Sequence, residues 1–173
     1  KTIEKYEKLK ASKKPKNTPV IAAMIEHLDN SSGKIFQKVS DLGLEDNTII
    51  IFYSDNGGLE SDADQTPLKA GKGWLYEGGI KVPLIVKWKG LIQPNTTSKS
   101  LVSSIDFLPT LLEVAGVKEI PESVDGESLV TIFKKPASQV HETLFWHYPH
   151  YNEPPPCGAV RHGDWKLIEW YDK

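Results

Sequence analysis

Apolar residues recur every three or four positions between residues 20 and 42, which predicts a long amphipathic helix there. Thr18 can cap the start of this helix, and Pro19 suits its first position because a helix leaves that backbone N–H unpaired anyway. Gly43 suits its end, where the chain must leave the helical conformation. We therefore expect the helix to begin directly after Thr18 and to pack by one apolar face.

Two continuous apolar runs alternate with helical patterns and predict strands. Residues 48–53 (TIIIFY) are almost all β-branched or aromatic, which is typical of a strand buried on both faces of a mostly parallel sheet. Residues 82–88 predict a second strand. Residues 107–115 predict another amphipathic helix, which Asp106 can cap and Gly116 can end. This alternation of helix and strand predicts an α/β fold.

After residue 136 the pattern changes to short strands. Residues 143–146 predict one strand, and residues 159–171 predict a hairpin with the three-residue loop His162-Gly163-Asp164. Three consecutive prolines at residues 154–156 cannot join a sheet and mark a stiff connection. This part is expected to form a small antiparallel subdomain.

Length and composition are those of one ordinary globular domain. The chain has 173 residues, a net charge of −2 and 39% apolar residues, and its apolar runs are much shorter than the roughly 18 residues of a membrane span. Residues 1–17 contain seven lysines, no arginine and one aromatic residue, so we expect a basic linker and no nucleic-acid site. The single cysteine excludes an internal disulfide and a zinc site with two or more cysteines.

The segment SDNGG, which follows the first predicted strand, offers candidate metal ligands. In open α/β sheets, ligands bind beyond the carboxyl ends of the strands, which is where Asp55 and Asn56 lie. A carboxylate and an amide oxygen suit a hard cation such as Ca²⁺ or Mg²⁺. The alternative is an ordinary turn, because Asp-Asn-Gly is also frequent turn chemistry.

A second candidate lies in the glycine-rich loop that follows, where Lys72 stands between two glycines. A lysine without bulky neighbours can point into a cleft and bind an anion such as sulfate or phosphate as a point charge. The alternative is a solvated loop lysine.

Six segments of the chain, in order, resemble the sulfatase family of the alkaline-phosphatase superfamily. They are DNTIIIFYSDNGG, PLKAGKGWLYEGGIKVPLIVKWKG, SSIDFLPTLLEVAG, VDGESL, ETLFWHYPHY and AVRHGDWKLIEWY. The resemblance implies an alkaline-phosphatase-like three-layer α/β/α sandwich, present in part over residues 18–135. The basic linker at residues 1–17 precedes it, and the start of a small C-terminal antiparallel-sheet subdomain follows at residues 136–173.

The resemblance also implies a function, the hydrolysis of sulfate esters. Asp55 and Asn56 match the family's calcium ligands, so Ca²⁺ is expected, with Mg²⁺ as the second choice. Lys72 matches the lysine that contacts the sulfate group and acts in catalysis, and Lys69 matches a further basic residue near the substrate. In the family the nucleophile is a formylglycine, made from Cys or Ser in a Cys/Ser-x-Pro-Ser-Arg motif.

Aromatic and histidine side chains concentrate in FWHYPHY, which the resemblance places near the substrate. His147 and His150 are the candidates for substrate contact, and the alternative for the whole segment is core packing of the small sheet. Cys157-Gly158-Ala159-Val160-Arg161 only superficially fits a relaxed form of the formylglycine motif. We therefore interpret Cys157 as an incidental cysteine.

The resemblance is partial, because the paired aspartates and the nucleophile motif that sulfatases carry upstream are not in this sequence. We therefore expect an inactive C-terminal fragment of a sulfatase, cut at both ends. The parent protein is expected to act on a sulfated small molecule or carbohydrate and to be exported (periplasmic or extracellular) or lysosomal. Two alternatives stay open: a phosphatase-like or phosphonate-hydrolase-like member of the superfamily, and a noncatalytic remnant.

Overall fold

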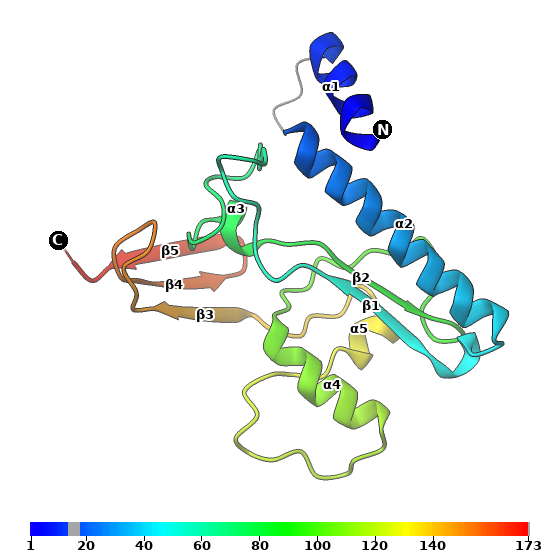
Figure 1. Ribbon diagram of the computed structural model, residues 1–173. Helices are drawn as coiled ribbons and strands as arrows, with labels where there is room; N and C mark the ends of the chain where they lie inside the picture. Colours follow the sequence, from blue (N-terminus) through cyan, green and yellow to red (C-terminus); the bar gives the residue numbers. More distant parts are fainter. Residues whose placement is uncertain (14–17, 173) are drawn as a thin grey trace. The chain divides into compact units, whose positions relative to one another are not determined.

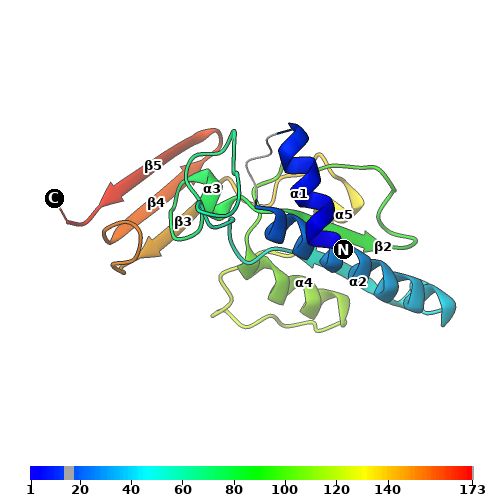
Figure 2. The ribbon, with the colours of Figure 1, turned by 45° about the horizontal axis from the view of Figure 1, so that its top comes forward.

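The computed structural model describes residues 1–13 and 18–172, which form two compact units divided between residues 88 and 89 (Figures 1 and 2). The first unit contains α1 (Thr2–Lys13), α2 (Pro19–Asp41), the short 3-10 helix η1 (Glu45–Asn47), β1 (Ile49–Tyr53), α3 (Glu77–Ile80) and β2 (Leu84–Trp88). The second unit contains η2 (Ser104–Asp106), α4 (Phe107–Val114), α5 (Val130–Lys134), β3 (Thr143–Tyr148), β4 (Cys157–His162) and β5 (Trp165–Trp170).

The predicted long helix is confirmed as α2, including its signals at both ends. Thr18 Oγ1 accepts a hydrogen bond from the Ile21 backbone N–H at 3.3 Å, and Pro19 is the first helical residue. Gly43 follows the helix with a φ of +66°, a conformation that glycine adopts without steric cost. These local signals were sufficient because a cap involves only residues within a few positions of one another.

Part of the basic run at residues 1–17 forms the helix α1. In α1, the Lys5 ammonium forms an ion pair with Glu26 of α2, and the Tyr6 hydroxyl donates to the same carboxylate at 2.7 Å. The hydrogen bond from Lys5, with that from Tyr6, holds the pKa of Glu26 below its usual value. Residues 14–17, the rest of the predicted linker, lie outside the described residues.

The expectation of a mostly parallel sheet around residues 48–53 is wrong for the described strands. β1 pairs antiparallel with β2 in a two-stranded sheet, with Ile51 opposite Val86. The apolar run indicated a strand correctly, but partner and direction depend on the connection between the strands. Here that connection is the long glycine-rich loop, which returns the chain antiparallel.

The second unit holds a three-stranded antiparallel sheet in the order β3-β4-β5, as predicted for the small subdomain. Two details differ from the prediction. β3 continues to Tyr148, and the β4–β5 loop has two residues instead of three, because His162 pairs directly with Trp165. Gly163 in this loop has a φ of +53°, as two-residue hairpin turns require.

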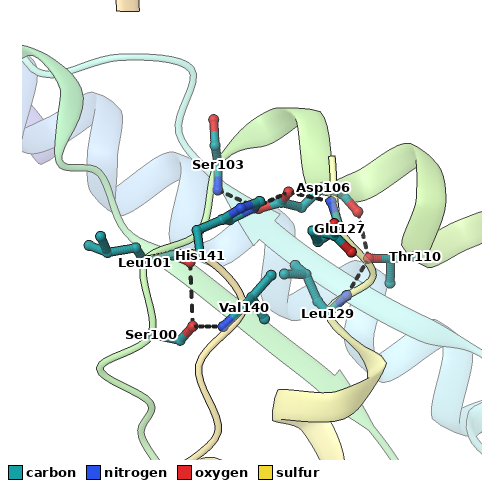
Figure 3. Close-up of polar contacts among 9 residues, drawn as sticks. All are labelled: Ser100, Leu101, Ser103, Asp106, Thr110, Glu127, Leu129, Val140 and His141. Atoms are coloured by element: carbon teal, nitrogen blue, oxygen red, sulfur yellow. Dashed lines mark hydrogen bonds and ion pairs between the residues drawn. The ribbon is translucent and has the colours of Figure 1, made fainter. Parts of the chain in front are cut away.

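A buried aspartate joins three segments of the second unit (Figure 3). The carboxylate of Asp106 is fully buried and accepts from the backbone N–H of Ser103 at 2.7 Å and from that of Glu127 at 2.9 Å. It also bonds Nε2 of His141 at 2.7 Å, just before β3. The expectation that Asp106 caps α4 is wrong, because its side chain makes no capping hydrogen bond to that helix. The carboxylate instead forms the capping box of η2 with Ser103 and fixes two segments that are distant in the chain.

Candidate active-site loops

Asp55 and Asn56 follow β1 after one residue, Ser54, at the carboxyl end of the strand, as the sequence predicted. The Asn56 backbone N–H donates to Asp55 Oδ1 at 2.9 Å, and the Ser54 hydroxyl donates to the Asn56 carbonyl oxygen at 3.1 Å. These bonds are those of a tight turn, so the turn interpretation holds for the backbone. The Asp55 side chain is exposed and the Asn56 side chain is half-buried, so turn and ligand are compatible roles.

Backbone hydrogen bonds join the Asp55-Asn56 turn to the glycine-rich loop that carries Lys72. The Gly57 N–H donates to the Gly79 carbonyl oxygen at 2.8 Å, and the Lys72 N–H donates to the Gly58 carbonyl oxygen at 2.9 Å. The structure therefore brings together the two segments in which the predicted metal ligands and the predicted sulfate-binding lysine lie. Two independent turns could form without these hydrogen bonds between them.

Glycines make this close approach possible. A Cβ atom on Gly57 would lie 1.7 Å from the Gly78 carbonyl oxygen, and one on Gly78 would lie 1.9 Å from the Ala70 carbonyl oxygen. Both contacts are with backbone atoms, which cannot rotate away as a flexible side chain can. Gly57 and Gly78 are therefore needed for packing.

Replacing Gly57 by alanine is expected to separate the two loops. The added methyl group collides with backbone, so we expect a loss of about 1–3 kcal/mol in the free energy of unfolding, or more if the loop cannot shift. Gly33→Ala is the matched control, because a Cβ atom there meets nothing within 4 Å and alanine favours the α2 helix. Urea denaturation compares the variants; equal midpoints for Gly57→Ala and the unchanged chain would contradict the packing role.

The two candidate lysines of the loop differ in their surroundings. Lys72 is exposed and followed by Gly73, whose φ is +91°. The Lys69 ammonium lies 3.9 Å from the centre of the Tyr76 ring, a cation–π contact, and the Lys69 carbonyl oxygen accepts from the Gly78 N–H at 2.8 Å. The contact between Lys69 and Tyr76 was not predicted from the sequence, which shows only that both residues lie on the same loop.

The two candidate histidines lie in the second unit and have different partners. Nδ1 of His147 in β3 bonds the Tyr171 hydroxyl at 2.9 Å. His150, beyond the end of β3, packs edge-on against the Tyr148 ring at 5.4 Å between centroids. Successive side chains of a strand point to opposite faces, so His147 and Tyr148 leave the sheet on opposite sides. His147 and His150 are three positions apart in the sequence. The sequence did not indicate that His150 packs on a side chain, Tyr148, that points to the opposite face of the sheet from His147.

The donors present suit part of a site for a hard cation. Asp55 and Asn56 offer adjacent carboxylate and amide oxygens, which are ligand types that calcium prefers. Within the described residues, no group of three or more His, Cys, Asp or Glu side chains could hold a metal ion. Calcium takes six to eight oxygen ligands, so the remaining ligands would have to come from other groups.

Cys157, the cysteine in the superficial formylglycine motif, is the first residue of β4 and fully buried. Burial raises the pKa of its thiol, because the apolar surroundings disfavour the charged thiolate. In the sheet its backbone is opposite Tyr148 on one side and Trp170 on the other. The position is that of a small core residue, which agrees with the interpretation of Cys157 as incidental.

Two family models match the chain. The model described as "Sulfatase" matches residues 2–117, and the model described as "N-sulphoglucosamine sulphohydrolase, C-terminal" matches residues 70–173.

Curated relatives include a sulfatase of Formosa agariphila, 38% identical over 194 aligned residues that cover 98% of this chain and 35% of the relative. Human arylsulfatase A is 35% identical over 144 residues, covering 80% of this chain and 28% of that protein. This chain therefore spans about a third of the length of these relatives.

Solved structures show the same fold. Ps i-CgsB, in complex with k-i-k-neocarrahexaose, has a TM-score of 0.84 at 28% identity and is matched over 98% of this chain and 38% of its own. A protein in complex with its substrate D-glucosamine-2-N,6-O-disulfate has a TM-score of 0.74 at 28% identity, over 88% of this chain and 31% of its own. None of the described helices is long and apolar enough to span a membrane.

Proposed function

This chain belongs to the sulfatase family, and we propose that it is part of a longer enzyme, called the parent protein below, that hydrolyses sulfate esters. Relatives at 35% identity and above include a protein named arylsulfatase A, and one solved neighbour holds a doubly sulfated sugar as its substrate. By analogy, the substrate of the parent protein is a sulfated carbohydrate or a sulfated small molecule.

The observation that carries the proposal is the pairing of the Asp55-Asn56 turn with the loop of Lys72. Two backbone hydrogen bonds, at 2.8 and 2.9 Å, hold the turn of Asp55 and Asn56 against the loop of Lys72. A sulfate ester carries negative charge on oxygens around a single sulfur atom. A site with a cation ligand set and an ammonium group suits such a substrate.

In this proposal each residue has a separate role. The side-chain oxygens of Asp55 and Asn56 hold a calcium ion, which when bound would offset negative charge on the sulfate oxygens. Lys72 binds a sulfate oxygen through its ammonium group. This interaction becomes stronger as negative charge develops on the reacting group. Lys69 adds positive charge from the same loop, oriented by the Tyr76 ring. His150 and His147 are the candidates for contact with the rest of the substrate.

The nucleophile belongs to the part of the parent protein that this chain does not contain. A formylglycine there would supply the attacking hydroxyl group. We therefore expect the isolated 173 residues to hydrolyse no sulfate ester and to bind calcium weakly.

The proposal is tested by comparing an aryl sulfate with an aryl phosphate as substrates of the parent protein. We expect kcat/KM to favour the sulfate by about 100-fold or more, since polar groups arranged for one ester are left unpaired by the other. Removal of calcium with a chelator should abolish the activity, and added calcium should restore it. A preference for phosphate would favour the phosphatase-like alternative, and no activity on either ester would favour a noncatalytic remnant.

A further inference from the structure

The peptide group between Asn56 and Gly57 is held at both of its ends. Its carbonyl oxygen accepts a hydrogen bond from the Ser54 hydroxyl at 3.1 Å, and its N–H donates to the Gly79 carbonyl oxygen at 2.8 Å. Gly57 also packs against backbone, because a Cβ atom there would lie 1.7 Å from the Gly78 carbonyl oxygen. This peptide group therefore has little freedom to rotate while the Asp55-Asn56 turn and the glycine-rich loop stay paired.

The dipeptide Asn56-Gly57 combines two groups that can react with each other. The backbone nitrogen that follows an asparagine can attack the carbon of the asparagine carboxamide, and glycine hinders this attack least because it has no Cβ atom. Every other asparagine of the chain precedes serine, threonine or glutamate. Asparagine is in addition one of the thermolabile residue types. Asn56 is therefore the asparagine of this chain that is most susceptible to this reaction.

We propose that Asn56 is a site of spontaneous deamidation, and that the pairing of the turn with the glycine-rich loop holds it unreacted. Opening of the pairing releases the peptide group between Asn56 and Gly57, and the amide of Asn56 is then converted to a carboxylate. The proposal is carried by the two hydrogen bonds of this peptide group and by the contact of Gly57 with backbone. It does not depend on sulfatase activity.

The reaction needs water and no other reactant. In the first step the Gly57 nitrogen loses its proton to water or hydroxide and forms a bond to Cγ of Asn56, while the Cγ–Nδ2 bond breaks and ammonia leaves. Water then adds to a carbonyl carbon of the cyclic imide, and the ring opens to aspartate or to isoaspartate. Nothing is oxidised or reduced, so the net change is gain of water and loss of ammonia.

The pairing opposes the first step in two ways. The proton that must leave Gly57 is the one donated to Gly79, and hydrogen-bonded backbone amides lose their protons to solvent mainly through local opening. Ring closure also requires rotation of the peptide group, which the bond from Ser54 and the contact with Gly78 oppose. The rate of deamidation should therefore follow the population of molecules in which the pairing is open.

The products hinder the pairing from forming again. Isoaspartate adds a carbon atom to the main chain directly before Gly57, where the close contact with the Gly78 backbone leaves no room. Aspartate keeps the length of the chain but places a second carboxylate next to Asp55. The consequence for calcium rests on the proposed function: Asn56 would no longer offer an amide oxygen, so opening of the loops would lead to permanent loss of the site.

Peptide mass spectrometry measures the reaction directly. The parent protein and a synthetic peptide of residues 53–60 are incubated in mildly alkaline buffer, with a chelator that excludes protection by a bound cation. The mass gain from replacing NH₂ by OH is then located in the sequence. We expect Asn56 to react at least about 100-fold more slowly in the protein than in the peptide, because the pairing must open first. Asn95, which is exposed and precedes Thr96, is the internal control and should gain no mass.

Variants that weaken the pairing should accelerate the reaction in the parent protein. Gly78→Ala places a Cβ atom 1.9 Å from the Ala70 carbonyl oxygen, and we expect deamidation of Asn56 to be about tenfold faster or more. Ser54→Ala removes one hydrogen bond without a collision, so it tests the proposal even if Gly78→Ala does not fold; we expect about threefold acceleration. Gly33→Ala, whose Cβ atom meets nothing within 4 Å, is the matched control and should leave the rate unchanged.

Several results would overturn the proposal. Equal rates in the peptide and in the folded parent protein would show that the pairing does not protect Asn56, and a peptide that gains no mass would show that Asn56 is not a site of deamidation. Unchanged rates in both Gly78→Ala and Ser54→Ala would refute the role of the pairing.

Activity on an aryl sulfate, measured on the same samples, separates this proposal from the proposed function. Activity that falls in step with the modified fraction would support both. A protein that gains mass at Asn56 in the expected order of rates but hydrolyses no sulfate ester would support the deamidation site and contradict the proposed function.

Discussion

Replacing Asp106 by alanine is expected to lower the free energy of unfolding by about 3–5 kcal/mol, the cost of breaking a buried, charge-assisted network by removing one partner. The carboxylate accepts three hydrogen bonds, from Ser103, Glu127 and His141, within a fully buried position. Alanine would leave two backbone N–H groups and an imidazole without their acceptor. Each such buried group costs roughly 1–3 kcal/mol.

Urea denaturation followed by circular dichroism measures this effect. Asp106→Asn should recover only part of the loss, because an amide offers one oxygen where the carboxylate offers two, and its NH₂ group faces other donors. Asp125→Ala is the matched control, since Asp125 is exposed and belongs to the same segment as Glu127. If Asp106→Ala lowers the free energy of unfolding as little as Asp125→Ala does, the three segments are held together without this carboxylate.

Replacing Lys72 by alanine in the parent protein is expected to lower kcat/KM for an aryl sulfate by about 100- to 1,000-fold, the usual effect of removing one charge-stabilising group. The backbone of Lys72 is fixed by its hydrogen bond to Gly58, at 2.9 Å, so the alanine variant should keep the loop intact. The lost group is therefore the side chain beyond Cβ, with its ammonium group. Steady-state kinetics with a folded variant measures the effect.

The control and the conservative variant sharpen this prediction. Lys81→Ala removes another exposed lysine, just after α3, and so makes the same change in net charge. We expect it to change kcat/KM less than about threefold, because an exposed charge outside the site contributes little. Lys72→Arg keeps the charge but not the compact shape, so we expect intermediate activity. A Lys72→Ala enzyme as active as the Lys81→Ala enzyme would remove Lys72 from the site.

Much of the candidate site could be predicted because its residues stand in short, recognisable segments. Asp55 and Asn56 follow a continuous apolar strand, and Lys72 stands between two glycines. The pairing of these segments through Gly57, Gly58 and Gly79 could not be predicted in the same way. Those hydrogen bonds join residues more than ten positions apart, and their existence depends on how the whole loop folds back.

The opposite orientations of neighbouring side chains in β3 could not be predicted from local signals either. The strand was predicted to end at residue 146, but it continues to Tyr148 and includes His147. Because His147 and Tyr148 both belong to the strand, their side chains point to opposite faces of the sheet. The length of a strand depends on its partner, and β4 pairs with β3 over all six residues.

By itself, the sequence determined the elements whose signals are local. These are the start and end of α2, the existence of β1, β2 and the C-terminal hairpin, and the turn at Asp55, because caps, turns and strand propensity involve residues within a few positions. Only the tertiary structure decided the antiparallel pairing of β1 with β2, the three-way contact of Asp106, and the extension of β3 to Tyr148. These features depend on which distant segments meet, and the free energy of such contacts depends on burial that a single segment does not specify.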